Sequence, residues 1–103
     1  MTPTARTLQE LRKRGYRCQV VEQTIPKTFI KRDLWGLWDV LAIRDAETLA
    51  VQVTSGSNVS ARLQKIAESE AVADCRKAGW SLFVHGWRKG ANGRYVLREI
   101  DVS

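Results

Sequence analysis

The segment DVLAIRDAETLAVQVTSG, residues 39–56, constrains the fold more than any other part of the chain. Two runs rich in aliphatic and β-branched residues, 37–44 and 48–54, are separated only by the sequence DAE. Such short spacing is typical of an antiparallel β-hairpin. Apolar residues occupy both faces of both runs, so we expect the hairpin to be buried from two sides within a larger sheet.

The residues before the hairpin predict one helix and one further strand. A helix is expected over 3–14, because Thr2 can cap its N-terminus and Pro3 suits its first position. A β-rich strand follows over 16–23. Residues 25–33 contain a proline and several basic residues, which predict a loop or an irregular edge segment.

The residues after the hairpin predict a second helix and two more strands. The helix is expected over 59–79 with Asn58 as its N-cap, and strands are expected over 80–87 and 94–102. The elements follow in the order αβββαββ. We therefore predict a single α/β domain, residues 1–103, with a mixed central sheet flanked by two helices.

The charge of the chain favours an anionic partner. Seventeen Lys and Arg against eleven Asp and Glu give a net charge of +6, and nucleic acid leads the list of partners that such a surface attracts. A basic soluble protein without such a partner is the alternative. No run approaches the roughly 20 apolar residues of a membrane span, and residues 1–16 lack the apolar core of a signal peptide. We expect an intracellular, cytoplasmic protein.

The two cysteines, Cys18 and Cys75, stand alone in the sequence. Neither belongs to a CxxC motif or to a cluster of Cys and His residues, so neither a zinc site nor a disulfide framework is indicated. We expect both to be reduced thiols that are partly buried.

Three motifs resemble a known superfamily. They are RDLWGLWDVLAI (32–43), VQVTSGSNVSARLQKI (51–66) and VHGWRK (84–89). Together with the order of helix, three-stranded meander, helix and returning strand, they resemble the PD-(D/E)XK nuclease superfamily. Within it, the chain is similar to small phage and bacterial proteins related to Holliday-junction resolvases and to the virus-type replication-repair nuclease domain. The resemblance covers residues 7–98 and implies a restriction-endonuclease-like core, in a bacterial host if the protein is phage-encoded.

The resemblance also implies a metal site on the hairpin. In that superfamily an Asp at the start of the second core strand and an acidic residue on the third bind a divalent metal, with a Lys two positions later. Asp39 matches the first position, whereas Gln52, Val53 and Thr54 occupy the third-strand motif, so an amide and a hydroxyl replace the usual carboxylate and Lys. Gln52 and Thr54 share one face of the strand. Mg²⁺ or Mn²⁺ could take oxygens from the Asp39 carboxylate, the Gln52 amide and the Val53 backbone carbonyl.

A second carboxylate would strengthen this site. Glu22, at the end of the first predicted strand, and Asp33, before the second, are the two candidates near Asp39, and we favour Glu22. In resolvase relatives a Glu on the first helix often contributes, but Glu10 lies too close to Gly15 to match that position well.

The missing Lys needs a cationic substitute. Superfamily members relocate this residue, and the helix after the motif offers Arg62 and Lys65 in its first turns. Lys65 is the closer chemical match. Arg62 cannot act as a base, although it can stabilise negative charge on a phosphate.

Further residues are candidates for DNA contacts or for the core. Basic residues flank the predicted site in the order of elements, and we expect four of them to contact DNA: Lys31, Arg32, Arg88 and Lys89. Trp35 and Trp38 could stack on bases, but core positions are the favoured interpretation. His85, the single histidine, lies in an apolar strand and is predicted to be structural.

These residues predict a metal-dependent endonuclease that hydrolyses DNA phosphodiester bonds, with branched or junction DNA as a candidate substrate. The alternative is a nuclease-fold module that binds DNA without turnover, as Gln52 and Thr54 would permit. A phage protein that binds another protein is a third possibility. Resolution of branched DNA requires two symmetric cuts, so that substrate would imply a homodimer.

Overall fold

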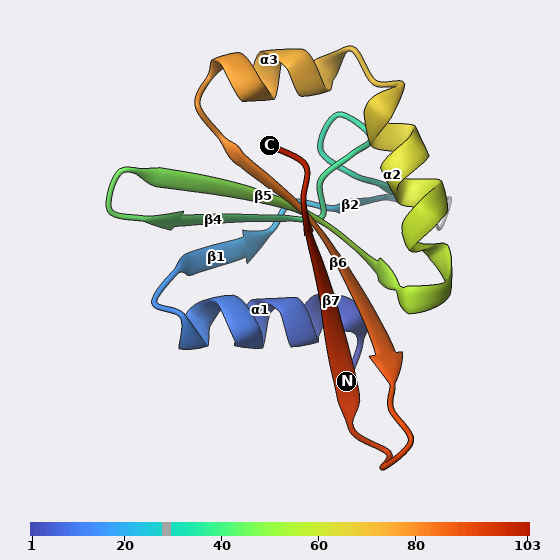
Figure 1. The fold of residues 1–103 in the computed structure, drawn as a ribbon. Helices are drawn as coiled ribbons and strands as arrows, with labels where there is room; N and C mark the ends of the chain where they lie inside the picture. Colours follow the sequence, from blue (N-terminus) through green and yellow to red (C-terminus); the bar gives the residue numbers. More distant parts are fainter. Residues whose placement is uncertain (28–29) are drawn as a thin grey trace.

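Five strands form one mixed sheet through the centre of the protein (Figure 1). The computed structural model describes residues 1–27 and 30–103, with only the backbone of Lys31. The sheet order is β1-β4-β5-β6-β7, and only β5 and β6 run parallel. The strands are β1 (Arg17–Val20), β4 (Val40–Arg44), β5 (Glu47–Ser55), β6 (Ser81–Lys89) and β7 (Tyr95–Asp101). The predicted single α/β domain with a mixed sheet is confirmed.

The β4–β5 hairpin is formed as the sequence predicts, and it organises two cores. Arg44 pairs with Glu47, which leaves Asp45 and Ala46 as the loop. Residues on β5 alternate between two apolar clusters, with Ala50 in the cluster under α2 and α3 and Val51 in the cluster under α1. The hairpin is therefore buried from both sides, as its apolar composition indicated.

Helix α1 (Pro3–Lys13) covers one face of the sheet, while α2 (Val59–Ala67) and α3 (Ala71–Lys77) cover the other (Figure 1). The amide of Ala5 donates to Thr2 Oγ1 at 3.1 Å, so the predicted cap is confirmed. A short 3₁₀ turn, Gly56–Asn58, precedes α2.

The prediction of one helix over 59–79 is wrong, because the described structure divides it at residues 68–70. In a continuous helix Val72 would lie about a third of a turn away from the sheet-facing side of Ile66. The break reorients the chain, so that Ile66, Val72 and Cys75 are all buried in one core. The protein thus has three α-helices among its described residues, where two were predicted.

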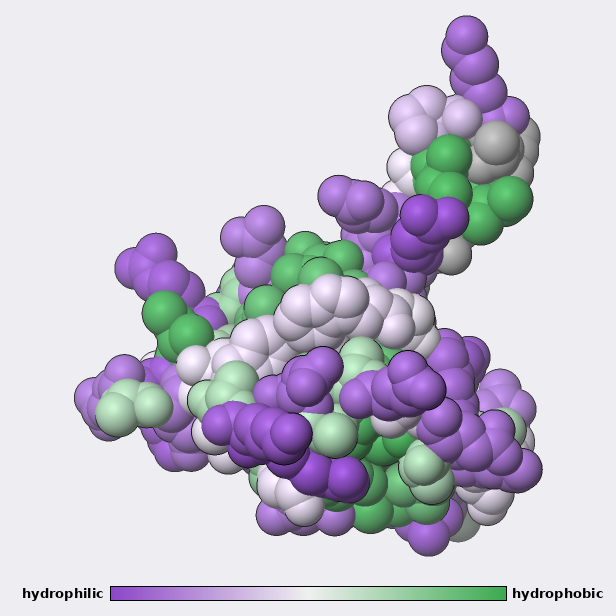
Figure 2. Space-filling view, turned by 90° about the horizontal axis from the view of Figure 1, so that it is seen from above, coloured by the Kyte–Doolittle hydropathy of each residue, from purple (hydrophilic) through white to green (hydrophobic). Residues whose placement is uncertain are grey.

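A second, two-stranded sheet forms an arm where a loop or irregular edge was predicted. The expected strand over 16–23 ends at Val20, and β2 (Gln23–Ile25) pairs antiparallel with β3 (Ile30–Arg32). Figure 2 shows this arm projecting from the body of the protein at the upper right. The order αβββαββ must therefore be corrected by two additional strands and one additional helix. No helix in the described ranges is long and apolar enough to cross a membrane.

Candidate metal centre

Three carboxylates meet beside the open end of the β4–β5 hairpin. One oxygen from each of Glu22, Asp33 and Asp39 lies within 4.8 Å of the other two. We call these three residues the carboxylate cluster. Asp39 is only 6% exposed, whereas Glu22 and Asp33 are half-buried. Both acidic residues considered as partners of Asp39 are therefore brought to it, including Asp33, which was not favoured.

The β2–β3 arm explains how residues 11 positions apart come together. Gln23 pairs with Arg32 in the last rung of the arm, so the preceding Glu22 and the following Asp33 face each other at its base. Asp39 is held against the main sheet by its own backbone. Its amide donates to the Val51 carbonyl at 2.9 Å, and its carbonyl accepts from the Val21 amide at 2.9 Å.

Strand β5 fixes the orientation of the Asp39 side chain. Asp39 Oδ2 accepts hydrogen bonds from Gln52 Nε2 at 2.9 Å and from the Val53 amide at 2.7 Å. Gln52 is 1% exposed, and its Oε1 has no hydrogen-bond partner among the described residues. Gln52 and Asp39 thus meet as predicted, although the amide presents nitrogen to the carboxylate.

The cluster concentrates negative charge in a place that water reaches poorly. Burial, a hydrogen bond with Asp33 and the charges of Asp33 and Glu22 together raise the pKa of Asp39 to about 7, although the hydrogen bond from the Val53 amide lowers it. Asp39 therefore takes up a proton near neutral pH. A positive ion in the cluster would remove this repulsion.

Lys65 brings a cation to the edge of the cluster. It projects from α2, and its Nζ lies 3.9 Å from Asp33 Oδ2, at the outer limit of an ion pair. Arg62 lies one turn earlier on α2 and is half-buried, and its Nε has no hydrogen-bond partner in the described part of the chain. Of the two predicted substitutes for the missing Lys, the structure places Lys65 beside the carboxylates.

Two other candidates lie outside the cluster. Thr54 is buried on the same face of β5 as Gln52, but no hydrogen bond of the described residues joins its hydroxyl to the carboxylates. Glu10 accepts a hydrogen bond from Arg14 Nε at 2.9 Å within α1, on the opposite face of the sheet. Glu10 therefore lies apart from the carboxylate cluster.

The basic residues predicted to contact DNA lie in two places. Arg32 lines a hollow of about 410 Å³ together with Glu22 and Asp33. Arg88 and Lys89 are both exposed. Arg88 lies near the start of α2, because a Cβ added to Gly56, just before that helix, would be 3.0 Å from the Arg88 Cβ. The side chain of Lys31 lies outside the described residues.

The aromatic pair of the LWGLW motif divides between core and surface. Trp38 is fully buried, as predicted, whereas Trp35 is 57% exposed, which corrects its predicted core position. The left-handed backbone of Trp35, with φ of 54°, turns this residue outward. The adjacent Gly36 was the only local signal of such a turn.

Comparison with protein-family models, with curated proteins and with solved structures finds no match to this chain. The chemistry of the cluster must therefore be judged from its own residues.

Proposed function

We propose that the protein is a divalent-metal-dependent endonuclease that hydrolyses DNA phosphodiester bonds. The arrangement of the main sheet supports the resemblance to the PD-(D/E)XK superfamily. Helix α1 precedes three antiparallel strands, β1, β4 and β5, and helices α2 and α3 then lead to the parallel strand β6. This is the order of helix, meander, helix and returning strand that the resemblance implies, with the β2–β3 arm inserted after the first strand.

The observation that carries the proposal is the carboxylate cluster with Lys65 at its edge. Its donors are oxygen atoms, which Mg²⁺ and Mn²⁺ prefer. Gln52 adds an independent indication, because its buried Oε1 has no partner among the described residues. A half-turn of this amide would exchange its oxygen and nitrogen, and the two orientations are nearly isosteric. The residues therefore fit a hard divalent cation.

Glu22, Asp33 and Asp39 would hold the metal, with Gln52 Oε1 as a further oxygen ligand. The Val53 carbonyl is available on the same edge, since the N–H and C=O of one strand residue point to the same side and the Val53 amide reaches Asp39. When bound, Mg²⁺ or Mn²⁺ polarises the scissile phosphate and lowers the pKa of a coordinated water.

The basic residues take the remaining roles. Lys65 stabilises negative charge that develops on the phosphate, and its contact with Asp33 keeps its ammonium group beside the cluster. Arg62 would support it from the preceding turn. Three described basic residues would position neighbouring phosphates: Arg32 at the base of the arm, and Arg88 and Lys89 at the end of β6.

A DNA-binding module without turnover is the second candidate function. It is favoured by the hydrogen bond from Gln52 Nε2 to Asp39, which satisfies one carboxylate oxygen without a metal. The separation of Thr54 from the carboxylates also favours it. Both functions require DNA binding, so only the cleavage reaction distinguishes them.

The test is cleavage of labelled single-stranded, duplex, flapped and four-way DNA with Mg²⁺, Mn²⁺ or EDTA. We expect cleavage with either metal, no cleavage in EDTA, and a loss of more than about a hundredfold in rate for Asp39→Asn. Asp45→Asn is the matched control, because Asp45 carries the same charge in the exposed turn at the far end of the hairpin. Lys65→Met should lower the rate while DNA binding is retained.

Metal-dependent cleavage that Asp39→Asn retains would overturn the assignment of the site. If the folded wild-type protein binds DNA but cuts none of the four substrates, the binding-module function replaces the nuclease. Binding is measured separately by fluorescence anisotropy with Ca²⁺, which oxygen ligands also accept.

A further inference from the structure

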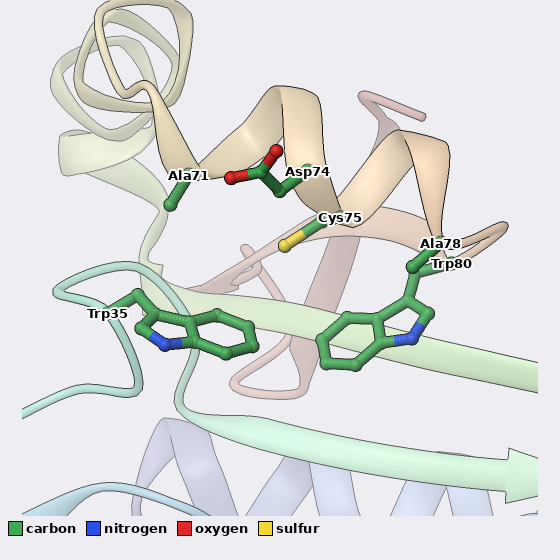
Figure 3. Close-up of a pocket in the computed structure, with 6 residues that line it drawn as sticks. All are labelled: Trp35, Ala71, Asp74, Cys75, Ala78 and Trp80. Carbon is green, nitrogen blue, oxygen red and sulfur yellow. The ribbon is translucent and has the colours of Figure 1, made fainter.

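A pocket of about 290 Å³ lies between helix α3 and two tryptophan rings (Figure 3). Trp35 and Trp80 form its floor, with ring centroids 5.6 Å apart and ring planes inclined by 33°. Four residues of and beside α3 form the opposite wall: Ala71, Asp74, Cys75 and Ala78. Two alanines and a cysteine leave room above the rings, so the pocket is a slot with an aromatic floor.

The loop that carries Trp35 holds this residue in an unfavourable backbone conformation. Trp35 adopts the left-handed region, with φ of 54°, which a bulky L-residue rarely occupies. Hydrogen bonds close the loop, from Leu34 to Trp38 and from Trp38 back to Leu34, at 3.0 and 3.1 Å. A strained, 57% exposed tryptophan on a closed loop is unusual for a residue that only packs.

Trp35 also connects this pocket to the carboxylate cluster. The same residue lines the neighbouring hollow that contains Glu22, Asp33 and Arg32. Asp33 belongs to the cluster and lies only two residues before Trp35. A ligand seated on the Trp35 ring is therefore next to the proposed point of cleavage.

We propose that the Trp35–Trp80 pocket binds one unpaired nucleobase of the DNA strand that is cut; this rests on the proposed function. A base presents a flat face that stacks on the two indole rings, and stacking of this kind tolerates any sequence. Asp74, on the α3 side, accepts hydrogen bonds and so favours bases that carry an amino group. A base paired within a continuous duplex is not available to the slot, so the pocket selects single-stranded, bulged or branched DNA.

Charge and shape favour a base over the other ligand that tryptophan rings bind, a methylated ammonium group. The net charge of +6 attracts a DNA strand, which would bring the base to the slot. The two rings lie side by side as a floor, whereas a cage for a cation surrounds it with ring faces. The hollow that Arg32 lines shares Trp35 with the slot, and the Arg32 guanidinium attracts phosphate.

The experiment compares wild type with Trp35→Ala and Trp35→Phe by fluorescence anisotropy in Ca²⁺. The probes are a single-stranded 20-mer, its duplex, and the duplex with one extra unpaired 2-aminopurine. We expect Trp35→Ala to lose about 5- to 150-fold in affinity for the single-stranded and bulged probes, the range for one stacked base, and less than about twofold for the duplex. Trp35→Phe should retain most of the affinity.

Ile43→Ala is the matched control, because Ile43 is 53% exposed and lies near the other end of β4. Circular dichroism verifies that each variant is folded. The 2-aminopurine provides a second measurement, because the wild type should quench its fluorescence by stacking and Trp35→Ala should not.

Equal loss of affinity for all three probes, or no loss, overturns the base pocket. If Trp35→Ala cuts single-stranded and duplex DNA with Mg²⁺ in the wild-type ratio, the pocket fails while the nuclease stands. If no DNA is cut but the selective loss of binding is found, the pocket stands on the binding-module function. A trimethyllysine peptide that binds the wild type and not Trp35→Ala, with DNA affinity unchanged, would assign the pocket to cations instead.

Discussion

The two faces of the sheet both bury polar side chains, but they satisfy them differently. On the α1 face, a hydrogen-bonded chain runs from Trp87 through Thr7 and His85 to Glu99. Its distances are 2.9 Å from Trp87 Nε1 to Thr7 Oγ1, 3.1 Å from Thr7 Oγ1 to His85 Nδ1 and 2.7 Å from His85 Nε2 to Glu99 Oε2. We call these four residues the buried polar chain, after Thr7 and His85 at its centre, which are fully buried, whereas Glu99 at its end is exposed.

The donors and acceptors of the buried polar chain match in only one way. The Trp87 indole only donates, so Thr7 accepts from it and donates its own proton to His85 Nδ1. His85 Nε2 then carries the proton that Glu99 accepts. Burial lowers the pKa of His85 more than Glu99 raises it, so the ring is neutral. This supports the predicted structural role of His85.

The carboxylate cluster on the opposite face differs, because like charges meet there. One oxygen from each of its three acidic groups lies within 4.8 Å of the other two, and Lys65 Nζ lies 3.9 Å from Asp33. Gln52 Oε1 has no partner among the described residues. A buried polar group that serves only the fold is expected to be satisfied, as the chain on the α1 face is. The comparison teaches that polar burial by itself does not indicate function, whereas carboxylates that meet in a partly buried place mark a candidate site.

The largest expected effect comes from breaking the buried polar chain. Thr7→Val keeps the shape of the side chain but leaves the Trp87 indole and His85 Nδ1 without partners. We expect a loss of about 2–4 kcal/mol in the free energy of unfolding, because each unsatisfied buried group costs about 1–3 kcal/mol. Urea unfolding followed by circular dichroism measures it.

Thr7→Ser is the control, since it retains the hydroxyl and loses only a methyl group. Asp39→Asn tests the same kind of change in the carboxylate cluster. It removes the repulsion between Asp39 and the other two carboxylates and leaves an oxygen that can accept from the Val53 amide. The stability of this variant should therefore equal or exceed that of wild type. Thr7→Val as stable as Thr7→Ser would show that the chain contributes little.

A divalent cation should stabilise the carboxylate cluster alone. At Mn²⁺ ten times above its dissociation constant, binding to the folded protein adds about 1.4 kcal/mol to the free energy of unfolding. The melting temperature should then rise by about 5–10 °C in wild type and in Thr7→Val, and by much less in Asp39→Asn. Equal shifts in wild type and Asp39→Asn would mean that the ion binds elsewhere.

The smallest expected effect is a difference in pH dependence, measured without metal. The pKa of His85, which faces Glu99 and also senses Arg14 and Glu10, lies below 6.5 in the folded protein. The unfolded chain therefore takes up this proton first, and stability falls as the pH drops below 6.5. The pKa of Asp39 is raised from 3.8 to about 7, so the folded protein binds that proton first and stability rises as the pH drops below 7.

The contributions of His85 and Asp39 to the free energy of unfolding oppose each other between pH 6.5 and the lowered pKa of His85 in the folded protein. Wild type should consequently change little on mild acidification, whereas Asp39→Asn should lose up to about 1.4 kcal/mol per pH unit. Asp45→Asn serves as the control and should follow wild type. Parallel profiles for wild type and Asp39→Asn would contradict the raised pKa of Asp39.

The sequence by itself determined the elements whose signals are local. The capping Thr2 and the apolar stripe predicted α1, and the short DAE spacing predicted the central hairpin, since helix starts and tight turns depend on residues close together in the chain. The alternation along β5 likewise placed Gln52 on the same side of the strand as Thr54. Asp39 was singled out by the resemblance to the PD-(D/E)XK superfamily, and its role as a metal ligand stays a prediction.

Only the tertiary structure decided which of these residues meet. The pairing of Gln23 with Arg32 joins Glu22 to Asp33, and no local pattern predicts it, because the arm's register depends on contacts across the turn. The division between α2 and α3 follows from burying Ile66 and Val72 in one core rather than from a Gly or Pro. Trp35 and Trp38 have similar neighbours in the sequence. The chain reverses between them in the closed loop, so Trp38 is buried in the core and Trp35 is exposed.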